Sequence, residues 1–192
     1  MTLKEVDKMI EVTANKSSDI GIKELKSVGM ISVRGDLLNN RFQKIIANSC
    51  NLAVPKPLSI NHKKDLSVAW MSPDELLILD YSESYLEKIT EDFKSLATGM
   101  ETLVLDMSSS RSLFLINGSL WREVLAKGTP IDLRPTSFKR DSFRRTRMGQ
   151  IAVAFWMVDK HSVHIICSSS HSSFFYDWLC NASTKGSLEK YF

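Results

Sequence analysis

The sequence predicts an α+β fold made of two tandem units, each with the order strand, helix, strand, strand, helix. In both halves, short apolar runs of strand length are followed by stretches whose apolar residues recur at helical spacing. A strand, a glycine and an amphipathic helix also occur twice in that order, around Gly35 and around Gly118. Because one such unit cannot cover both faces of its sheet, we expect the two units to share one core.

Composition and cysteine usage narrow the class of protein. The chain has 192 residues, of which 43% are apolar and 24% charged, as in ordinary globular proteins. The charged amino terminus does not resemble a secretion signal, and no apolar run approaches the roughly 20 residues that span a bilayer. Cys50, Cys167 and Cys180 are far apart and form no C-x-x-C motif. We therefore expect reduced thiols, a cytoplasmic location and no membrane partner.

The first unit follows a polar segment. Residues 1–29 have few apolar anchors, and we expect them to form a loosely held arm. A strand is expected over Met30–Arg34, and Asp36 is placed to cap the next helix. A hairpin with a proline turn is expected over 66–79, and a second helix over 84–97. The first helix would bury an apolar stripe: Leu38, Phe42, Ile45 and Ile46.

The second unit is expected to begin with a buried strand over Val104–Met107. A polar crossing at 108–111 leads into another strand and the Asn117–Gly118 turn. Ser119 is placed to cap a helix that ends near Ala126. A basic loop, two strands and a last helix follow, at 134–149, 151–157, 162–167 and 172–182.

The repeat sets the expected domain organisation. Besides the two glycines, Ala69-Trp70 lines up with Ala154-Phe155, a match of pattern rather than identity. The arm, the single domain and its two half-repeats are residues 1–29, 30–192, about 30–100 and about 103–182.

Motifs of common catalytic sites are absent from the sequence. It contains no G-x-S-x-G, P-loop, dinucleotide-binding glycine motif or H-E-x-x-H. His161, His164 and His171 could approach one another, but no Cys, Asp or Glu stands at ligand spacing from them. We therefore expect neither a metal site nor catalytic residues in this chain.

The polar crossing allows two interpretations. Ser108, Ser109 and Ser110 could hold a phosphate or carboxylate together with Arg111. The favoured interpretation is structural, with hydroxyls satisfying local backbone amides and Asp106 forming a buried or half-buried ion pair with Arg111.

Residues 134–147 carry six basic side chains and one acidic side chain, whereas the rest of the chain is net negative. Only Phe138 and Phe143 could stack on nucleobases there, so nucleic-acid binding is the least favoured of three functions. A plain solvated loop remains open. A partner surface is favoured, because long loops are often functional and Arg, Phe and Met suit protein contacts. The basic residues are Arg134, Lys139, Arg140, Arg144, Arg145 and Arg147.

Four motifs, taken in order, resemble the gamma subunit of heterotetrameric sarcosine oxidase. They are WMSPDELL at 70–77, DMSSSR at 106–111, LAKG with PIDL at 125–128 and 130–133, and RMGQ at 147–150. The resemblance covers about residues 28–182.

The resemblance implies a fold similar to the folate-binding domain of the glycine-cleavage aminomethyltransferase. It also implies a complex with alpha, beta and delta subunits that oxidatively demethylates sarcosine to glycine, forming hydrogen peroxide and methylenetetrahydrofolate. FAD, FMN, NAD and tetrahydrofolate would be held by the other subunits, and this chain would support assembly. The alternative is a stand-alone folate-binding or folate-dependent one-carbon protein, for which Asp106 is the only candidate acid.

Overall fold

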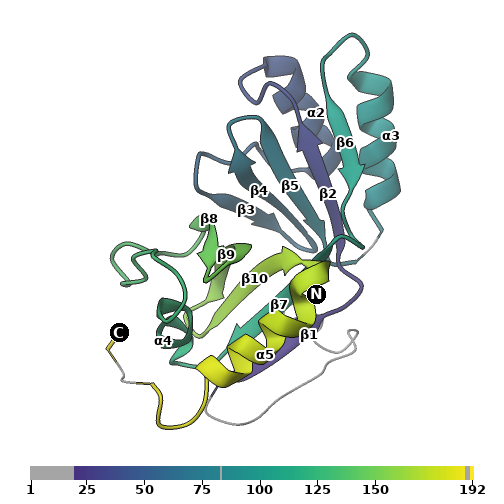
Figure 1. Ribbon diagram of the computed structural model, residues 1–192. Helices are drawn as coiled ribbons and strands as arrows, with labels where there is room; N and C mark the ends of the chain where they lie inside the picture. The colour runs from purple at the N-terminus through teal and green to yellow at the C-terminus, as the bar shows by residue number, and fades with distance from the viewer. Residues whose placement is uncertain (1–19, 83, 189–190) are drawn as a thin grey trace. The chain divides into compact units, whose positions relative to one another are not determined.

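The computed structural model describes residues 20–82, 84–188 and 191–192, and the chain divides into two compact units (Figure 1). The first contains residues 27–109, and the second combines residues 20–26 with 110–192. Each unit has a five-stranded antiparallel sheet with helices packed against it. The predicted α+β class and its two related units are confirmed.

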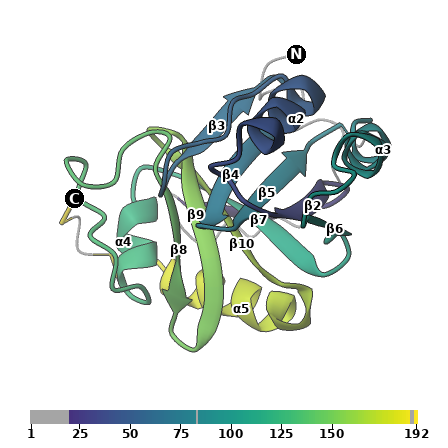
Figure 2. The ribbon, with the colours of Figure 1, turned by 90° about the horizontal axis from the view of Figure 1, so that it is seen from above.

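In the first unit, α2 and α3 cover one face of the sheet (Figure 2). Phe42 of α2 meets Phe93 of α3 edge to face, with ring centroids 5.7 Å apart, above Ile31 and Val33 of β2. The strand order is β3-β4-β5-β2-β6. The elements are β2 (Gly29–Arg34), α2 (Asn40–Cys50), β3 (Ile60–Lys63), β4 (Leu66–Ser72), β5 (Glu75–Asp80), α3 (Leu86–Leu96) and β6 (Leu103–Asp106).

The second unit repeats this order with a shorter first helix. Phe114 of β7 meets Phe175 of α5 edge to face at 5.6 Å, and α4 packs into the same apolar cluster. The strand order is β8-β9-β10-β7-β1. The elements are β1 (Gly21–Leu25), β7 (Arg111–Asn117), α4 (Trp121–Ala126), β8 (Phe143–Met148), β9 (Ile151–Asp159), β10 (Ser162–Ser168), the 3-10 turn η1 (Ser169–His171) and α5 (Ser172–Ala182).

The two units exchange their edge strands. β1 precedes β2 in the chain but pairs with β7, whereas β6 precedes β7 but pairs with β2. The expectation of a loose arm is therefore wrong for residues 20–25, where Ile20 and Ile22 are buried and β1 is hydrogen-bonded into a sheet. The rest of the expected arm, residues 1–19, lies outside the described residues. The strand Val104–Met107, expected to be buried in the second half-repeat, is instead the exposed edge strand β6 of the first unit.

Strand register fixes which residues are equivalent in the two units. In the first unit, the residue two before Gly35 in β2 pairs with a residue of β5, which in turn pairs with Trp70 of β4. In the second unit, the residue two before Gly118 in β7 pairs with a residue of β10, which in turn pairs with Met157 of β9. Trp70 and Met157 are therefore equivalent. The sequence match of Trp70 with Phe155 is therefore wrong by two positions.

Both helix caps differ from the expectation. Asn39 caps α2, because its side-chain oxygen accepts hydrogen bonds from the first-turn amides. Asp36 instead accepts from the Leu38 amide at 2.9 Å and closes a turn ahead of the helix. That turn carries Leu38 out of the apolar stripe. Ser119 does not cap α4, which begins at Trp121 without a side-chain cap.

Strands β3 and β8 were not expected from the sequence. β8 occupies the second half of the predicted basic loop, and its buried ends are Phe143 and Met148. Both strands are edge strands with polar or charged residues, so they lack the apolar run by which a strand is recognised.

The remaining helices were located well. The predicted helix at 172–182 coincides with α5, although Phe174 is exposed. The predicted helix at 84–97 contains α3, which buries Ile89 and Phe93. Within the described residues, no helix is long and apolar enough to cross a membrane.

Candidate functional site

An open groove of about 660 Å³ lies on the first unit, and we call it the α2 groove. Its walls come from α2, from the connection between α2 and β3 (residues 51–59), and from the β4–β5 hairpin. The lining is largely apolar and includes Leu38, Trp70 and Pro73. Lys44 and Lys56 are the charged residues in this lining. The groove therefore suits an apolar group that carries a negative charge nearby.

Two large apolar side chains lie at the rim of the groove. Leu38 is 86% exposed, and Trp70 is only partly buried. A tryptophan beside a concave apolar surface is a common feature of protein interaction sites. No direct signal in the sequence indicates this site, because Leu38 fits the helical apolar stripe.

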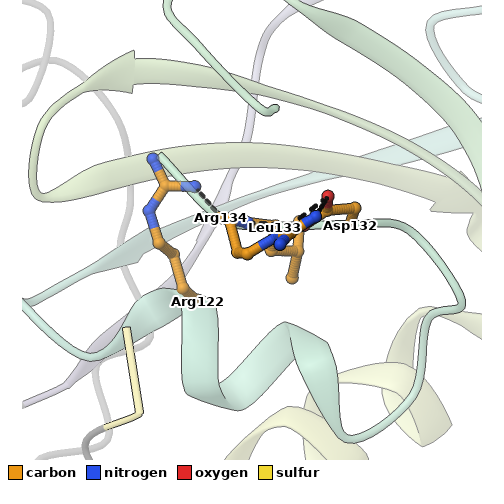
Figure 3. Close-up of polar contacts among 4 residues, drawn as sticks. All are labelled: Arg122, Asp132, Leu133 and Arg134. Atoms are coloured by element: carbon orange, nitrogen blue, oxygen red, sulfur yellow. Dashed lines mark hydrogen bonds and ion pairs between the residues drawn. The ribbon is translucent and has the colours of Figure 1, made fainter. Parts of the chain in front are cut away.

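In the second unit, Arg122 holds the connection between α4 and β8 (residues 127–142) against the sheet (Figure 3). Its guanidinium donates to the Leu133 carbonyl and, at 3.2 Å, to the Phe138 carbonyl. It also lies 3.4 Å from the sulfur of Met157 and 4.3 Å from the Trp121 ring centroid. Arg122 is only 9% exposed, and burial lowers the pKa of its guanidinium. The arginine thus works as a clamp on backbone carbonyls.

The clamp brings two apolar side chains of the connection into the core. Leu133 and Phe138 are both buried, and Phe138 meets Trp121 and Phe155 edge to face at 6.1 and 5.2 Å. The sequence did not single out Arg122, although an arginine inside an apolar helical stretch was a usable signal.

The basic residues 134–147 present charge without aromatic surface. Phe138 and Phe143 are fully buried and Met148 nearly so, which leaves no aromatic ring here for a nucleobase or for the core of an interface. Arg145 and Arg147 are exposed on β8, whereas Arg144 is half-buried with its guanidinium 5.8 Å from the Phe138 ring centroid. Arg134, Lys139 and Arg140 are exposed in the preceding connection.

Arg134 is paired with a neighbouring acid. Its guanidinium binds both carboxylate oxygens of Asp132 at 2.6 to 3.1 Å (Figure 3). These hydrogen bonds hold the pKa of Asp132 well below its ordinary value and raise that of Arg134. Both side chains are solvent-exposed, and the charge of Arg134 is already paired within the chain.

The predicted burial of Asp106 is wrong, because Asp106 is exposed, and its pairing with Arg111 stays a prediction. Asp106 belongs to the first unit and Arg111 to the second. The Asp106 carboxylate accepts hydrogen bonds from the amide and hydroxyl of Ser108, at 2.8 and 2.6 Å. The Ser108 hydroxyl in turn accepts from the Met30 amide at 2.9 Å, so this serine satisfies an amide of the neighbouring strand β2 rather than a local one.

The two repeat glycines occupy positions that exclude a side chain for different reasons. A Cβ at Gly35 would lie 2.8 Å from the Phe42 ring. Gly118 has a φ of 140°, which other residues rarely adopt, and its amide donates to the His161 carbonyl at 2.8 Å.

The histidines and cysteines form no recognisable centre. His164 is buried and meets Trp156 edge to face, whereas His161 and His171 are exposed. In the described residues, no group of three His, Cys, Asp or Glu side chains could hold a metal ion. Burial raises the pKa of the Cys50 and Cys167 thiols to about 12, which makes them poor nucleophiles.

Comparison with known proteins places this architecture. The model of the sarcosine oxidase, gamma subunit family matches residues 34–185. The chain belongs to this family. The gamma subunit of sarcosine oxidase from Corynebacterium sp. (strain U-96) is 29% identical over 120 residues. That alignment covers 62% of this chain and 57% of the relative, which is less than two thirds of the relative's length.

Solved structures show the same fold as this gamma-subunit family chain. A chain of the heterotetrameric sarcosine oxidase from Corynebacterium sp. U-96, in complex with pyrrole 2-carboxylate, is similar with a TM-score of 0.78 and 22% identity. The match covers 94% of this chain and 91% of that chain. The glycine cleavage system aminomethyltransferase T from Bartonella henselae is similar with a TM-score of 0.58 and 12% identity, over 92% of this chain and 48% of that one. The expected aminomethyltransferase-like fold is confirmed.

Proposed function

We propose that this chain is the gamma subunit of a heterotetrameric sarcosine oxidase and that it supports assembly rather than catalysis. The match of the family model to most of the chain carries this proposal, and the fold shared with a chain of a sarcosine oxidase heterotetramer supports it. The partners are the alpha, beta and delta subunits. The complete complex oxidatively demethylates sarcosine to glycine, with hydrogen peroxide and methylenetetrahydrofolate as the other products.

The residues available in this chain support an assembly role. Asp106, the only acid considered for folate chemistry, is exposed and hydrogen-bonded to its neighbour Ser108. We therefore assign FAD, FMN, NAD and tetrahydrofolate to the other subunits and assign no catalytic residue to this chain. A cytoplasmic location belongs to the same proposal, since the three free cysteines suit a reducing compartment.

The basic surface of the second unit is part of the proposed interface. Its members are Arg134, Lys139, Arg140, Arg144, Arg145 and Arg147. With Phe138 and Phe143 buried, this surface suits the polar rim of an interface, where charges raise the association rate and set orientation. An acidic patch on a larger subunit is the partner it would meet.

Co-expression with the candidate alpha, beta and delta subunits tests the proposal. A tag on the alpha subunit should recover this chain in stoichiometric amount, with sarcosine-dependent hydrogen peroxide formation by the complex. The chain purified alone should show no flavin absorbance between about 350 and 500 nm, because its sequence contains no dinucleotide-binding glycine motif. A chain that remains free, or that carries a flavin by itself, would refute the proposal.

A further inference from the structure

The two units treat one equivalent position in opposite ways. In the second unit, the space between α4 and β9 is filled by residues 133–138 of the same chain. Arg122 of α4 fixes this segment by its carbonyls and also reaches Met157 of β9. Met157 is thereby buried.

The equivalent residue in the first unit is Trp70, and it lines the open α2 groove. The connection that follows α2 (51–59) is shorter than the one that follows α4 (127–142), and its residues 53–57 line the groove without filling it. The first unit therefore leaves open a groove at the place that residues 133–138 fill in the second unit.

We propose that the α2 groove receives a turn-forming segment of a larger subunit, with a large apolar side chain placed between Leu38 and Trp70. This inference rests on the proposed function, since it names where such a subunit docks. The repeat supplies the form of the occupant: residues 133–138 fill the second unit with two apolar side chains, Leu133 and Phe138, on a turn of backbone closed by hydrogen bonds from the amides of residues 137 and 138 to the Arg134 carbonyl.

Charge determines the second property of the occupant. Lys44 and Lys56 are both exposed, and among the described residues no acidic side chain contributes to the groove lining. A carboxylate on the docked segment, next to its apolar anchor, would meet these two ammonium groups. Asn40, also exposed in the lining, can donate to a backbone carbonyl of the segment as Arg122 does in the other unit.

Photo-crosslinking in the assembled complex locates the occupant. The variant Leu38→p-benzoylphenylalanine is co-expressed with the alpha, beta and delta subunits, purified through the tag on alpha, irradiated and digested for mass spectrometry. The expected product joins position 38 to a peptide of a larger subunit that contains an aromatic or large aliphatic residue and an Asp or Glu. A crosslink to a second copy of this chain, or an assembled complex without any crosslink at position 38, would overturn the inference.

Two substitutions measure the contribution of the groove, each with a matched control. Leu38→Glu and Lys44→Glu should weaken retention by the tagged complex by on the order of tenfold or more, because they place like charge or an unpaired carboxylate in a docking pocket. Phe174→Glu and Lys94→Glu make the same changes at exposed positions outside the groove and should bind as the wild type does. Unchanged retention of both groove variants would overturn the docking site while leaving assembly intact. Failure of the wild-type chain to assemble would overturn the proposed function and the docking site together.

Discussion

The connections after α2 and after α4 occupy equivalent places in two units of the same topology, yet only one of them is closed. In the second unit, a longer connection held by a buried arginine covers the sheet, and Phe138 is a core residue. The first unit leaves Leu38 and Trp70 beside an open groove. Topology alone therefore does not determine which surface is finished within a chain and which is left for a partner.

The largest effect that distinguishes these connections is expected on truncating their apolar side chains. Phe138→Ala should lower the free energy of unfolding by about 3–5 kcal/mol, since it opens a cavity between Trp121 and Phe155. Leu38→Ala, at an exposed position, should change it by less than about 0.5 kcal/mol. Urea unfolding of the two variants and the wild type measures the difference. Equal losses would show that the two connections are not distinct in packing.

The clamp should be the next most important contribution. Arg122→Met removes the donor to two buried carbonyls and should cost about 2–4 kcal/mol of unfolding free energy. Arg122→Lys keeps a positive charge but cannot hold two carbonyls in a planar fork, so it should recover only part of the loss. Thermal and urea unfolding of both variants test this. A lysine variant as stable as the wild type would show that charge alone is sufficient.

Charge reversal on β8 should affect assembly and leave the fold intact. Arg145→Glu with Arg147→Glu places two acidic side chains on an exposed edge strand, where substitutions usually change stability by under about 0.5 kcal/mol. Association with the larger subunits should slow by roughly tenfold or more at low salt, and less at high salt. Surface plasmon resonance at two ionic strengths measures this. A loss that does not depend on salt would contradict a role in electrostatic steering, and a salt-dependent loss of DNA retention would favour nucleic-acid binding.

The smallest effect is expected at the exposed pair of Asp132 and Arg134. Because the folded-state pKa of Asp132 is depressed, its contribution to stability is present above the ordinary aspartate pKa of about 3.9 and is lost as the pH falls through the folded-state value. Asp132→Asn should therefore differ slightly from the wild type at neutral pH and converge with it in strong acid. Thermal unfolding over an acidic pH series, with an NMR titration of the Asp132 carboxyl, measures the sign. A difference that grows in acid would contradict it.

Local pattern was sufficient where an element is both apolar and regular. The short apolar runs of β4 and β5 and the aromatic face of α5 placed these elements within a residue or two. The pattern failed where a strand's partners are distant in the chain. β1 is hydrogen-bonded to β7, and no local signal in residues 21–25 indicates that pairing. β8 was hidden because its arginines alternate with few apolar residues.

The candidate site was the least predictable part of the molecule. Asp106 was expected to be buried because its sequence neighbours are apolar, but β6 is an edge strand and exposes most of its residues. Trp70 was matched to Phe155 because the adjacent alanines coincide, whereas the register of the paired strands matches it to Met157. The contrast between the open α2 groove and the filled second unit depends on that register, because the register shows that Trp70 and Met157 are equivalent and only Met157 is covered by a following segment.

The exchange of β1 and β6 between the two sheets also has a consequence for the order in which the chain can fold. Ribosomes add about 5–20 residues per second, so several seconds separate the synthesis of β1 from that of β7, the strand with which it pairs. During this interval the first unit can form its hairpin and helices, whereas the apolar Ile20 and Ile22 must wait without their sheet. A newly made chain therefore exposes a short, aggregation-prone strand until its second half emerges. Binding by a chaperone or by an early partner subunit would protect the chain most at that stage.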